Sequence, residues 1–193
     1  MKKHYITANE LLSDSFLLAK KVYDSGFRPD FIIGVWRGGA PVGIAIQEYL
    51  DYVGISTDHI SIRTSSYTGI NQQDQTVRVH GLDYIIDNIN ASDNVLLVDD
   101  VFDSGRSIRA IFERMKEKTR RNMPENMKVA TPWYKPNRNM TNYEPEFYIH
   151  KADHWLVFPH ELRGLSLSEI KEFKPDIADS VLSHMSNIKQ DTP

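Results

Sequence analysis

Four consecutive aliphatic residues, Val95–Val98, are the feature that most restricts how this chain can fold. A strand without polar alternation is typical of a parallel sheet that helices cover on both faces. A turn at Gly105 follows, and apolar residues then recur at helical spacing from Ile108 to Met115. Strand, glycine-containing turn and helix in this order predict an α/β fold with an open, mostly parallel sheet flanked by helices.

Strand and helix patterns also alternate along the rest of the chain. Further strands are predicted at Phe31–Trp36, around Ile60 and Ile62, at Val129–Trp133, at Phe147–Ile149 and at Trp155–Phe158. Helices are predicted after a capping box of Thr7 and Glu10, from about Pro41 to Tyr52, and between Leu165 and Phe173. A polar loop is predicted from Ser65 to about Gln75. Open parallel sheets bind ligands at the carboxyl ends of their strands, so the residues just after strands are the functional candidates.

The composition excludes several classes of protein. With 23 Lys and Arg against 26 Asp and Glu the net charge is −3, and we expect no nucleic-acid partner, because neutralising phosphates needs an excess of cations. No apolar run approaches about 18 residues, so we expect no membrane span. The chain has no cysteine. Its first residues lack the apolar core of a signal peptide, and we expect a cytoplasmic protein.

The strongest motif follows the Val95–Val98 strand directly. Asp99 and Asp100 stand at the strand end, and Asp103 follows three residues later. The turn from Ser104 to Ser107 then opens a helix, where backbone N–H groups can bind an anion. The acidic pair can accept hydrogen bonds from vicinal hydroxyls. Each residue alone could simply cap the helix, but together they indicate a site for a sugar that carries a phosphate.

This motif closely resembles the phosphoribosyl-pyrophosphate signature of the type I phosphoribosyltransferases. The resemblance implies that Asp99 and Asp100 hold the ribose hydroxyls. It implies a 5′-phosphate site made of Ser104, Gly105, Arg106 and Ser107. In members that use 6-oxopurines, the later aspartate lies beside N7 of the base as general acid/base, which gives that role to Asp103.

Two shorter segments occur in the order that the family has. Trp36 is followed by Arg37, Gly38 and Gly39, which resemble the pyrophosphate loop with its cis peptide before a glycine. Ser66 and Tyr67 resemble the start of a mobile loop that closes over the reaction. Taken alone, an Arg-Gly-Gly turn is usually only a connection from strand to helix, and a polar loop of this length is only a loop.

A fourth segment corresponds to the family's base pocket. The resemblance implies that Lys135 contacts O6 of the purine, that Trp155 stacks on the ring and that the Leu156 backbone meets its edge. Glu161 would then lie near the 2-position or a second magnesium ion. His160 stands where xanthine-guanine enzymes usually have tryptophan, so the preferred base stays open. Without the family, a surface lysine and a core tryptophan would be equally good interpretations.

The family therefore implies one phosphoribosyltransferase domain over residues 1–193, with a small hood for the base. Its core would cover about 28–162, and 163–193 would be a C-terminal helical extension. The implied enzyme is a pentosyltransferase of purine salvage. It joins phosphoribosyl pyrophosphate to hypoxanthine, guanine or xanthine, giving the nucleoside monophosphate and pyrophosphate.

The implied cofactor is Mg²⁺, with Asp99, Asp100 and Glu161 as ligands directly or through water. The implied assembly is a homodimer or homotetramer. The string from Asp99 to Asp103 also matches the Asp-Asp-x-x-Asp motif of terpenoid synthases, but those place it on a helix of an all-helical fold. The alternative that stays open is a non-catalytic regulator with the same fold that binds a nucleotide.

Overall fold

The computed structural model describes residues 3–67 and 76–188, and the chain divides into two compact units. The larger unit is Asn9–Asp153. The smaller combines Met1–Ala8 with His154–Pro193, so both ends of the chain belong to it. We describe each unit by itself.

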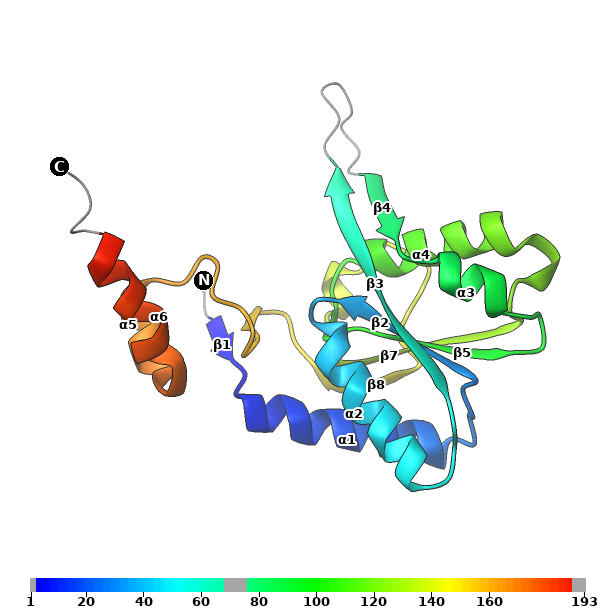
Figure 1. The fold of residues 1–193 in the computed structure, drawn as a ribbon, viewed down its shortest axis with the longest axis horizontal. Coiled ribbons are helices and arrows are strands. Elements are labelled where there is room, and N and C mark those ends of the chain that lie inside the picture. Colours follow the sequence, from blue (N-terminus) through cyan, green and yellow to red (C-terminus); the bar gives the residue numbers. More distant parts are fainter. Residues whose placement is uncertain (1–2, 68–75, 189–193) are drawn as a thin grey trace. The chain divides into compact units, whose positions relative to one another are not determined.

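The larger unit is built on a seven-stranded sheet (Figure 1). Its order is β4 (Thr76–His80), β3 (Asp58–Tyr67), β2 (Phe31–Trp36), β5 (Asn94–Val98), β7 (Asn126–Tyr134) and β6 (Val101–Phe102), and β8 (Phe147–Lys151) also pairs with β7. The pairs are parallel except for the antiparallel pair of β3 and β4. This confirms the open, mostly parallel sheet expected from the sequence.

Helices cover both faces of this sheet, which explains why its central strands are apolar without alternation. The helices are α1 (Ala8–Asp24), α2 (Gly39–Tyr52), α3 (Asp83–Asn88) and α4 (Arg106–Thr119), with 3-10 turns at Arg120–Asn122 and Pro136–Arg138. In Figure 1, α1 and α2 lie on one side of the strands and α3 and α4 on the other. Val95 and Leu97 pack in one core with Ile108 and Ile111 of α4. Leu96, which points to the opposite face, is equally buried.

Most of the expected elements are present, with shifted ends. The predicted strand Phe31–Trp36 has the observed bounds, whereas the expected loop from Ser65 begins too early. The backbone of Ser65, Ser66 and Tyr67 belongs to β3, because β4 pairs with it antiparallel as far as Thr76. The rest of that loop, 68–75, lies outside the described residues. The sequence analysis did not anticipate β4, α3 or the first strand of the chain.

The smaller unit contains a two-stranded parallel sheet in which β1 (Lys3–Tyr5) pairs with β9 (Trp155–Val157). Two helices follow, α5 (Leu167–Phe173) and α6 (Pro175–Ile188). The expected helix between Leu165 and Phe173 corresponds to α5. Its N-terminus carries a complete capping box of Ser166 and Glu169.

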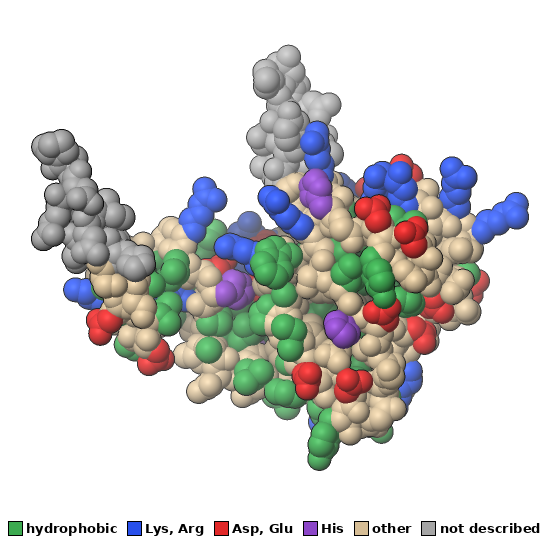
Figure 2. Space-filling view, in the orientation of Figure 1, with side chains coloured by type: hydrophobic (Ala, Val, Ile, Leu, Met, Phe, Trp, Pro, Cys, Tyr) green, Lys and Arg blue, Asp and Glu red, His purple; other side chains and the backbone are tan. Residues whose placement is uncertain are grey.

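None of the helices in the described ranges is long and apolar enough to cross a bilayer. The face of the molecule in Figure 2 carries Lys and Arg as well as Asp and Glu side chains. Some large apolar side chains are also exposed, among them Leu12, Phe16 and Leu17 on α1.

Candidate active site

The acidic pair lies where β5 ends in the middle of the large sheet. The N–H of Asp99 donates to the carbonyl of Ala130 on β7 at 3.2 Å, which fixes the chain as it leaves the strand. The N–H of Asp100 donates to Oδ1 of Asp99 at 3.0 Å. Burial raises the pKa of Asp99 well above its usual range, and the neighbouring charge of Asp100 raises this pKa further. A ligand that brings hydroxyl donors or a cation would relieve both effects.

The loop with Arg37, Gly38 and Gly39 packs against this pair. A Cβ atom on Gly38 would lie 1.8 Å from Oδ2 of Asp100, and one on Gly39 would lie 2.2 Å from the carbonyl oxygen of Val98. The peptide between Trp36 and Arg37 is cis. The loop after β2 and the acidic pair after β5 therefore meet at the carboxyl ends of two neighbouring strands. Only glycine, which has no Cβ atom, allows so close an approach.

The turn after Asp103 forms a small cavity at the start of α4. Gly105 has φ +72°, in the left-handed region that favours glycine. The cavity, of about 80 Å³, is lined by residues that include Asp99, Asp103, Ser104, Gly105, Arg106 and Ser107. The backbone N–H groups of a helix N-terminus beside such a cavity suit a phosphate group.

Asp103 is held between two cations that come from the segment after β7. The Nζ of Lys135 donates to Oδ2 of Asp103 at 3.1 Å, and the Nε of Arg138 lies 2.7 Å from Oδ1. Lys135 is only 4% exposed, and its N–H donates to the carbonyl of Phe102 at 2.9 Å. The structure thus brings together two of the residues singled out from the sequence. The sequence analysis missed Arg138. The one local sign of its role was its position three residues after Lys135, at the end of a short 3-10 turn.

The backbone of Ser66 and Tyr67 forms the last two residues of β3. Beside them along the strand, Thr64 Oγ1 donates to Ser107 Oγ at 3.4 Å, so β3 approaches the start of α4. The first two residues of the expected mobile loop thus belong to a strand, and the rest of that loop, within 68–75, lies outside the described part of the chain.

The remaining candidates lie in the smaller unit. Trp155 is 50% exposed and lines a cavity of about 260 Å³ together with Glu161. Lys3, Val157, Arg163, Gly164 and Leu165 also line this cavity. Leu156, the next residue of β9, is buried. A half-exposed indole beside a cavity does not fit the alternative of a core tryptophan. The sequence analysis missed Lys3 and Arg163, because no local pattern connects them with Trp155.

Within the described ranges, no group of three or more His, Cys, Asp or Glu side chains is arranged so that it could hold a metal ion. The larger unit offers two adjacent carboxylates, Asp99 and Asp100, while Glu161 belongs to the smaller unit. Mg²⁺ normally keeps several waters and takes one or two carboxylates together with substrate phosphates. The acidic pair beside an anion site fits that kind of binding.

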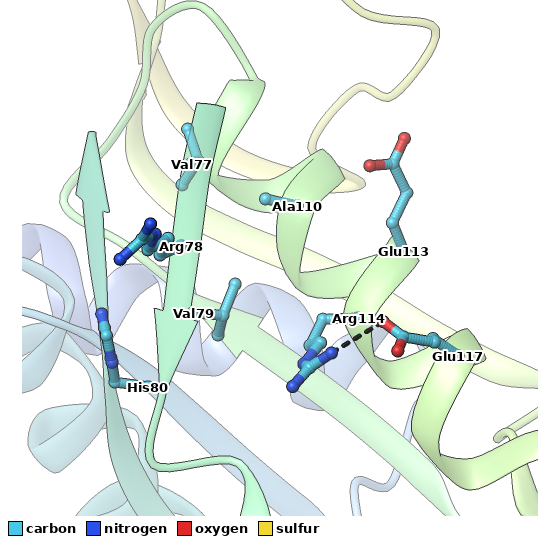
Figure 3. Close-up of a pocket in the computed structure, with 8 residues that line it drawn as sticks. All are labelled: Val77, Arg78, Val79, His80, Ala110, Glu113, Arg114 and Glu117. Atoms are coloured by element: carbon cyan, nitrogen blue, oxygen red, sulfur yellow. Dashed lines mark hydrogen bonds and ion pairs between the residues drawn. The ribbon is translucent and has the colours of Figure 1, made fainter. Parts of the chain in front are cut away.

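A larger groove of about 510 Å³ lies between β4 and α4 (Figure 3). Its walls carry Arg78 and His80 on the strand and Glu113, Arg114 and Glu117 on the helix. Arg114 and Glu117 form an ion pair at 2.8 Å, drawn as the dashed line in Figure 3. None of the residues that the sequence singled out lines this groove, so its size does not make it the active site.

Comparison with known proteins agrees with this geometry. The family described as "phosphoribosyl transferase domain" matches residues 8–162. A purine phosphoribosyltransferase from Pyrococcus horikoshii is 26% identical, with a TM-score of 0.64 over 86% of this chain and 98% of that one. A xanthine-guanine-hypoxanthine phosphoribosyltransferase from Helicobacter pylori is 21% identical, with a TM-score of 0.67 over 89% and 99%.

A protein from Neisseria gonorrhoeae solved with bound ppGpp has the same fold. It is 19% identical, with a TM-score of 0.70 over 91% of this chain and 98% of that one. Among curated protein sequences there is no significant match.

Proposed function

The chain belongs to the type I phosphoribosyltransferase family, and we propose that it transfers phosphoribose from phosphoribosyl pyrophosphate to a 6-oxopurine. The products would be the nucleoside monophosphate and pyrophosphate. The observation that carries the proposal is the pair of Lys135 and Asp103, 3.1 Å apart beside the anion cavity. A 6-oxopurine presents O6 next to N7 on one edge. A buried ammonium donor next to a carboxylate matches an O6 acceptor next to an N7 proton.

The sugar and its phosphates have matching groups at the edge of the same sheet. Asp99 and Asp100 would accept hydrogen bonds from the ribose hydroxyls, and the turn from Ser104 to Ser107 would bind the 5′-phosphate. Arg37 to Gly39 would hold the pyrophosphate, since glycines leave room for phosphate oxygens. The contact between this loop and Asp100 supports a common substrate for both segments.

The reaction follows from these positions. The bond between C1′ and the pyrophosphate oxygen breaks, which leaves positive charge at C1′, and the nearby carboxylates stabilise that charge. N9 of the purine forms the new bond to C1′, and its N7 proton passes to Asp103. Pyrophosphate takes the bonding electrons with it. Asp99 and Asp100 would hold Mg²⁺, which would supply positive charge to stabilise the leaving group.

The base would stack on Trp155 with its edge toward the backbone of Leu156, while Glu161 would face the 2-position or a second Mg²⁺, directly or through water. The chemistry leaves hypoxanthine, guanine and xanthine as candidates. We place the reaction in the cytoplasm and the enzyme in a homodimer or homotetramer. The purine enzymes of P. horikoshii and H. pylori support the class of base.

A base-competition assay tests the proposal. Purified protein with phosphoribosyl pyrophosphate and Mg²⁺ is offered hypoxanthine, guanine, xanthine, adenine and orotate, and nucleotide formation is followed for each. We expect at least one 6-oxopurine to react and adenine to be rejected by about 10⁴-fold, because a buried donor would face the amino group of adenine. If nucleotides bind but no base reacts, the protein is instead the non-catalytic regulator.

Lys135→Ala should lower kcat/KM for guanine and for hypoxanthine together. The difference between these values and kcat/KM for adenine should become smaller. The physical reason is that Lys135 is a donor only, and a buried charge without its partner is costly. Values of kcat/KM for each base measure this. Lys116→Ala, at an exposed site on α4, is the matched control and should resemble the wild type. Adenine reacting as fast as guanine in the wild type would rule out the role of Lys135.

A further inference from the structure

Lys174, between α5 and α6, is a buried lysine, and no carboxylate in the described part of the chain forms an ion pair with it. It is 8% exposed, and its Nζ donates to the carbonyl oxygens of Phe158 at 2.8 Å and Pro159 at 3.0 Å. Burial lowers the pKa of Lys174, and the charge of Glu161 opposes that shift. Lysines are almost never buried unless they are paired. The position therefore calls for a reason beyond simple packing.

The two carbonyl groups belong to the loop that follows the strand of Trp155. The carbonyl of Phe158 also accepts the N–H of Glu161 at 3.0 Å, and the N–H of Phe158 donates to Oε2 of Glu161 at 3.1 Å. The Nζ of Lys174 and the N–H of Glu161 thus donate to the same carbonyl oxygen, that of Phe158. Glu161 and Trp155 line one cavity of about 260 Å³. The ammonium group does not line this cavity, but it binds the backbone of the loop that carries Glu161.

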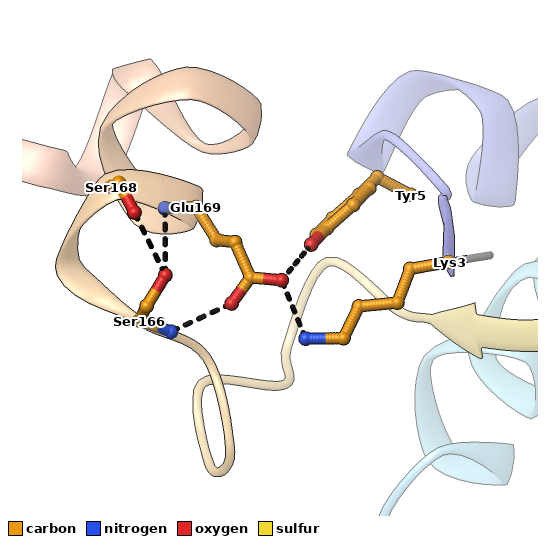
Figure 4. Close-up of polar contacts among 5 residues, drawn as sticks. All are labelled: Lys3, Tyr5, Ser166, Ser168 and Glu169. Atoms are coloured by element: carbon orange, nitrogen blue, oxygen red, sulfur yellow. Dashed lines mark hydrogen bonds and ion pairs between the residues drawn. The ribbon is translucent and has the colours of Figure 1, made fainter. Parts of the chain in front are cut away.

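The helix that leads to Lys174 is fixed at its other end as well (Figure 4). Oε1 of Glu169 accepts hydrogen bonds from Lys3 Nζ at 2.5 Å and from Tyr5 Oη at 2.6 Å. Oε2 of Glu169 accepts the N–H of Ser166 at 2.8 Å. Because Lys3 and Tyr5 belong to β1, which pairs with β9, α5 is tied to the strand pair that carries Trp155. Lys174 therefore has a defined position relative to the loop it binds.

We propose that Lys174 is a positioning residue of the purine pocket, which fixes the Phe158–Glu161 loop so that Glu161 faces a base stacked on Trp155. This inference rests on the proposed function, because it assigns the 260 Å³ cavity to the base. It gives the C-terminal extension a part in substrate recognition. A role in stability alone is a weaker explanation, because an apolar side chain of similar volume would avoid the free-energy cost of burying an ammonium group.

The test compares Lys174→Met with Lys171→Met. Methionine keeps most of the volume of lysine and removes the charge and the donors. Lys171 is an exposed lysine of α5, the helix that ends directly before Lys174, and serves as the control. For Lys174→Met we expect KM for the base to rise about tenfold, the usual scale for losing hydrogen bonds to a charged group. KM for phosphoribosyl pyrophosphate should stay within about twofold, since the sugar site is built by other residues. Lys174→Arg, which can still donate to both carbonyls, should recover most of the loss.

A readout that does not need activity separates this inference from the proposed function. Amide hydrogen exchange at Phe158 and Glu161 should accelerate in Lys174→Met and not in Lys171→Met, whether or not any base reacts. Faster exchange without turnover in the wild type would refute the proposed function and, with it, the role of Lys174 in binding a base. Turnover in the wild type with equal base KM in both methionine variants would overturn the inference alone. Equal losses for base and for phosphoribosyl pyrophosphate would also overturn it.

Discussion

Asp103 shows how much the chemistry of a single side chain depends on its neighbours. Its two oxygens face different cations, buried Lys135 on one side and half-exposed Arg138 on the other. Both cations come from the segment that follows β7. A carboxylate held in this way has a fixed orientation, which is what a general acid/base needs if the proton it moves is to lie within reach.

Replacing Asp103 with asparagine should therefore slow the transfer step and leave binding of phosphoribosyl pyrophosphate almost unchanged. Asparagine has nearly the same shape but cannot take the N7 proton, so we expect kcat to fall by roughly 10²–10⁴-fold. Affinity for phosphoribosyl pyrophosphate should change only a few-fold. Steady-state kinetics and calorimetry measure the two quantities. Asp87→Asn, at an exposed site on α3, is the control. A rate close to the wild-type value would remove Asp103 from the mechanism.

Trp155 gives a second test at the scale of one residue. Because it is 50% exposed, its truncation to alanine should leave the fold intact. We expect purine binding to weaken by about 1–3 kcal/mol, the scale of stacking between a base and an aromatic ring. Affinity for phosphoribosyl pyrophosphate should hardly change. Tyr52→Ala, at a site that is 91% exposed, controls for loss of a surface aromatic ring. Unfolding of Trp155→Ala would instead show that this side chain stabilises the fold, and the stacking role would fail.

At the scale of elements, the site depends on how closely the start of α2 approaches the end of β5. The carbonyl of Val98 and the Cα of Asp99 lie 2.2 Å and 2.9 Å from where a Cβ on Gly39 would stand. Both are backbone atoms at the end of a central strand, Val98 as its last residue and Asp99 as the next one, so neither can move without a large cost in free energy. The distance between the acidic pair and the loop of Arg37, Gly38 and Gly39 is therefore set by two backbone elements and not by any side chain.

Gly39→Ala should force these elements apart. We expect the free energy of unfolding to fall by about 1–3 kcal/mol, the usual cost of overpacking, and binding of phosphoribosyl pyrophosphate to be lost. Chemical denaturation and a binding titration measure this. Gly43→Ala on the same helix is the control, because its Cβ would meet nothing closer than 3.8 Å. It should be neutral or stabilise the helix by up to about 1 kcal/mol. Equal stability of both variants would refute the close approach.

At the scale of the whole molecule, the smaller unit is assembled from both ends of the chain. Its strands β1 and β9 come from opposite ends of the sequence, and Glu169 on α5 binds Lys3 and Tyr5 (Figure 4). These hydrogen bonds, first that from Lys3, lower the pKa of Glu169 from 4.5 to about 2. A charged Glu169 therefore stabilises this unit.

Stability of the smaller unit should consequently depend on pH. A lowered pKa in the folded state stabilises the fold above the unfolded value of 4.5, and this contribution is lost as the pH falls toward about 2. We expect Glu169→Gln to be less stable than the wild type at pH 6, with the difference shrinking between pH 4.5 and about 2. Denaturant titrations at several pH values measure this. Glu172→Gln, at an exposed site of α5, is the control. A difference that does not vary with pH would contradict the charge effect.

Local order along the chain was enough to predict the strand, the turn and the helix start that carry the candidate sugar-phosphate site. The segment from Val95 to Ser107 contains strand, acidic pair, turn and helix start without interruption, so neighbouring residues specify each other's conformation. The central strands were also predictable, since burial on both faces makes them continuously apolar. The sequence analysis missed strand β4, although Val77 and Val79 alternate with polar residues. The reason is that the polar residues before it predict a loop.

Only the tertiary structure decided which distant side chains act on the candidate site. Arg138 reaches Asp103, and Lys174 reaches the loop of Glu161, through contacts between residues far apart in the sequence. Such contacts depend on where whole elements pack, and no periodicity or local propensity encodes that. The sequence by itself thus determined the fold class and the local order of strand, acidic pair, turn and helix around Asp99–Ser107. Packing determined how the aspartate is held and how the loop after Trp155 is fixed, because each needs groups that meet only when the sheet and the two chain ends have assembled.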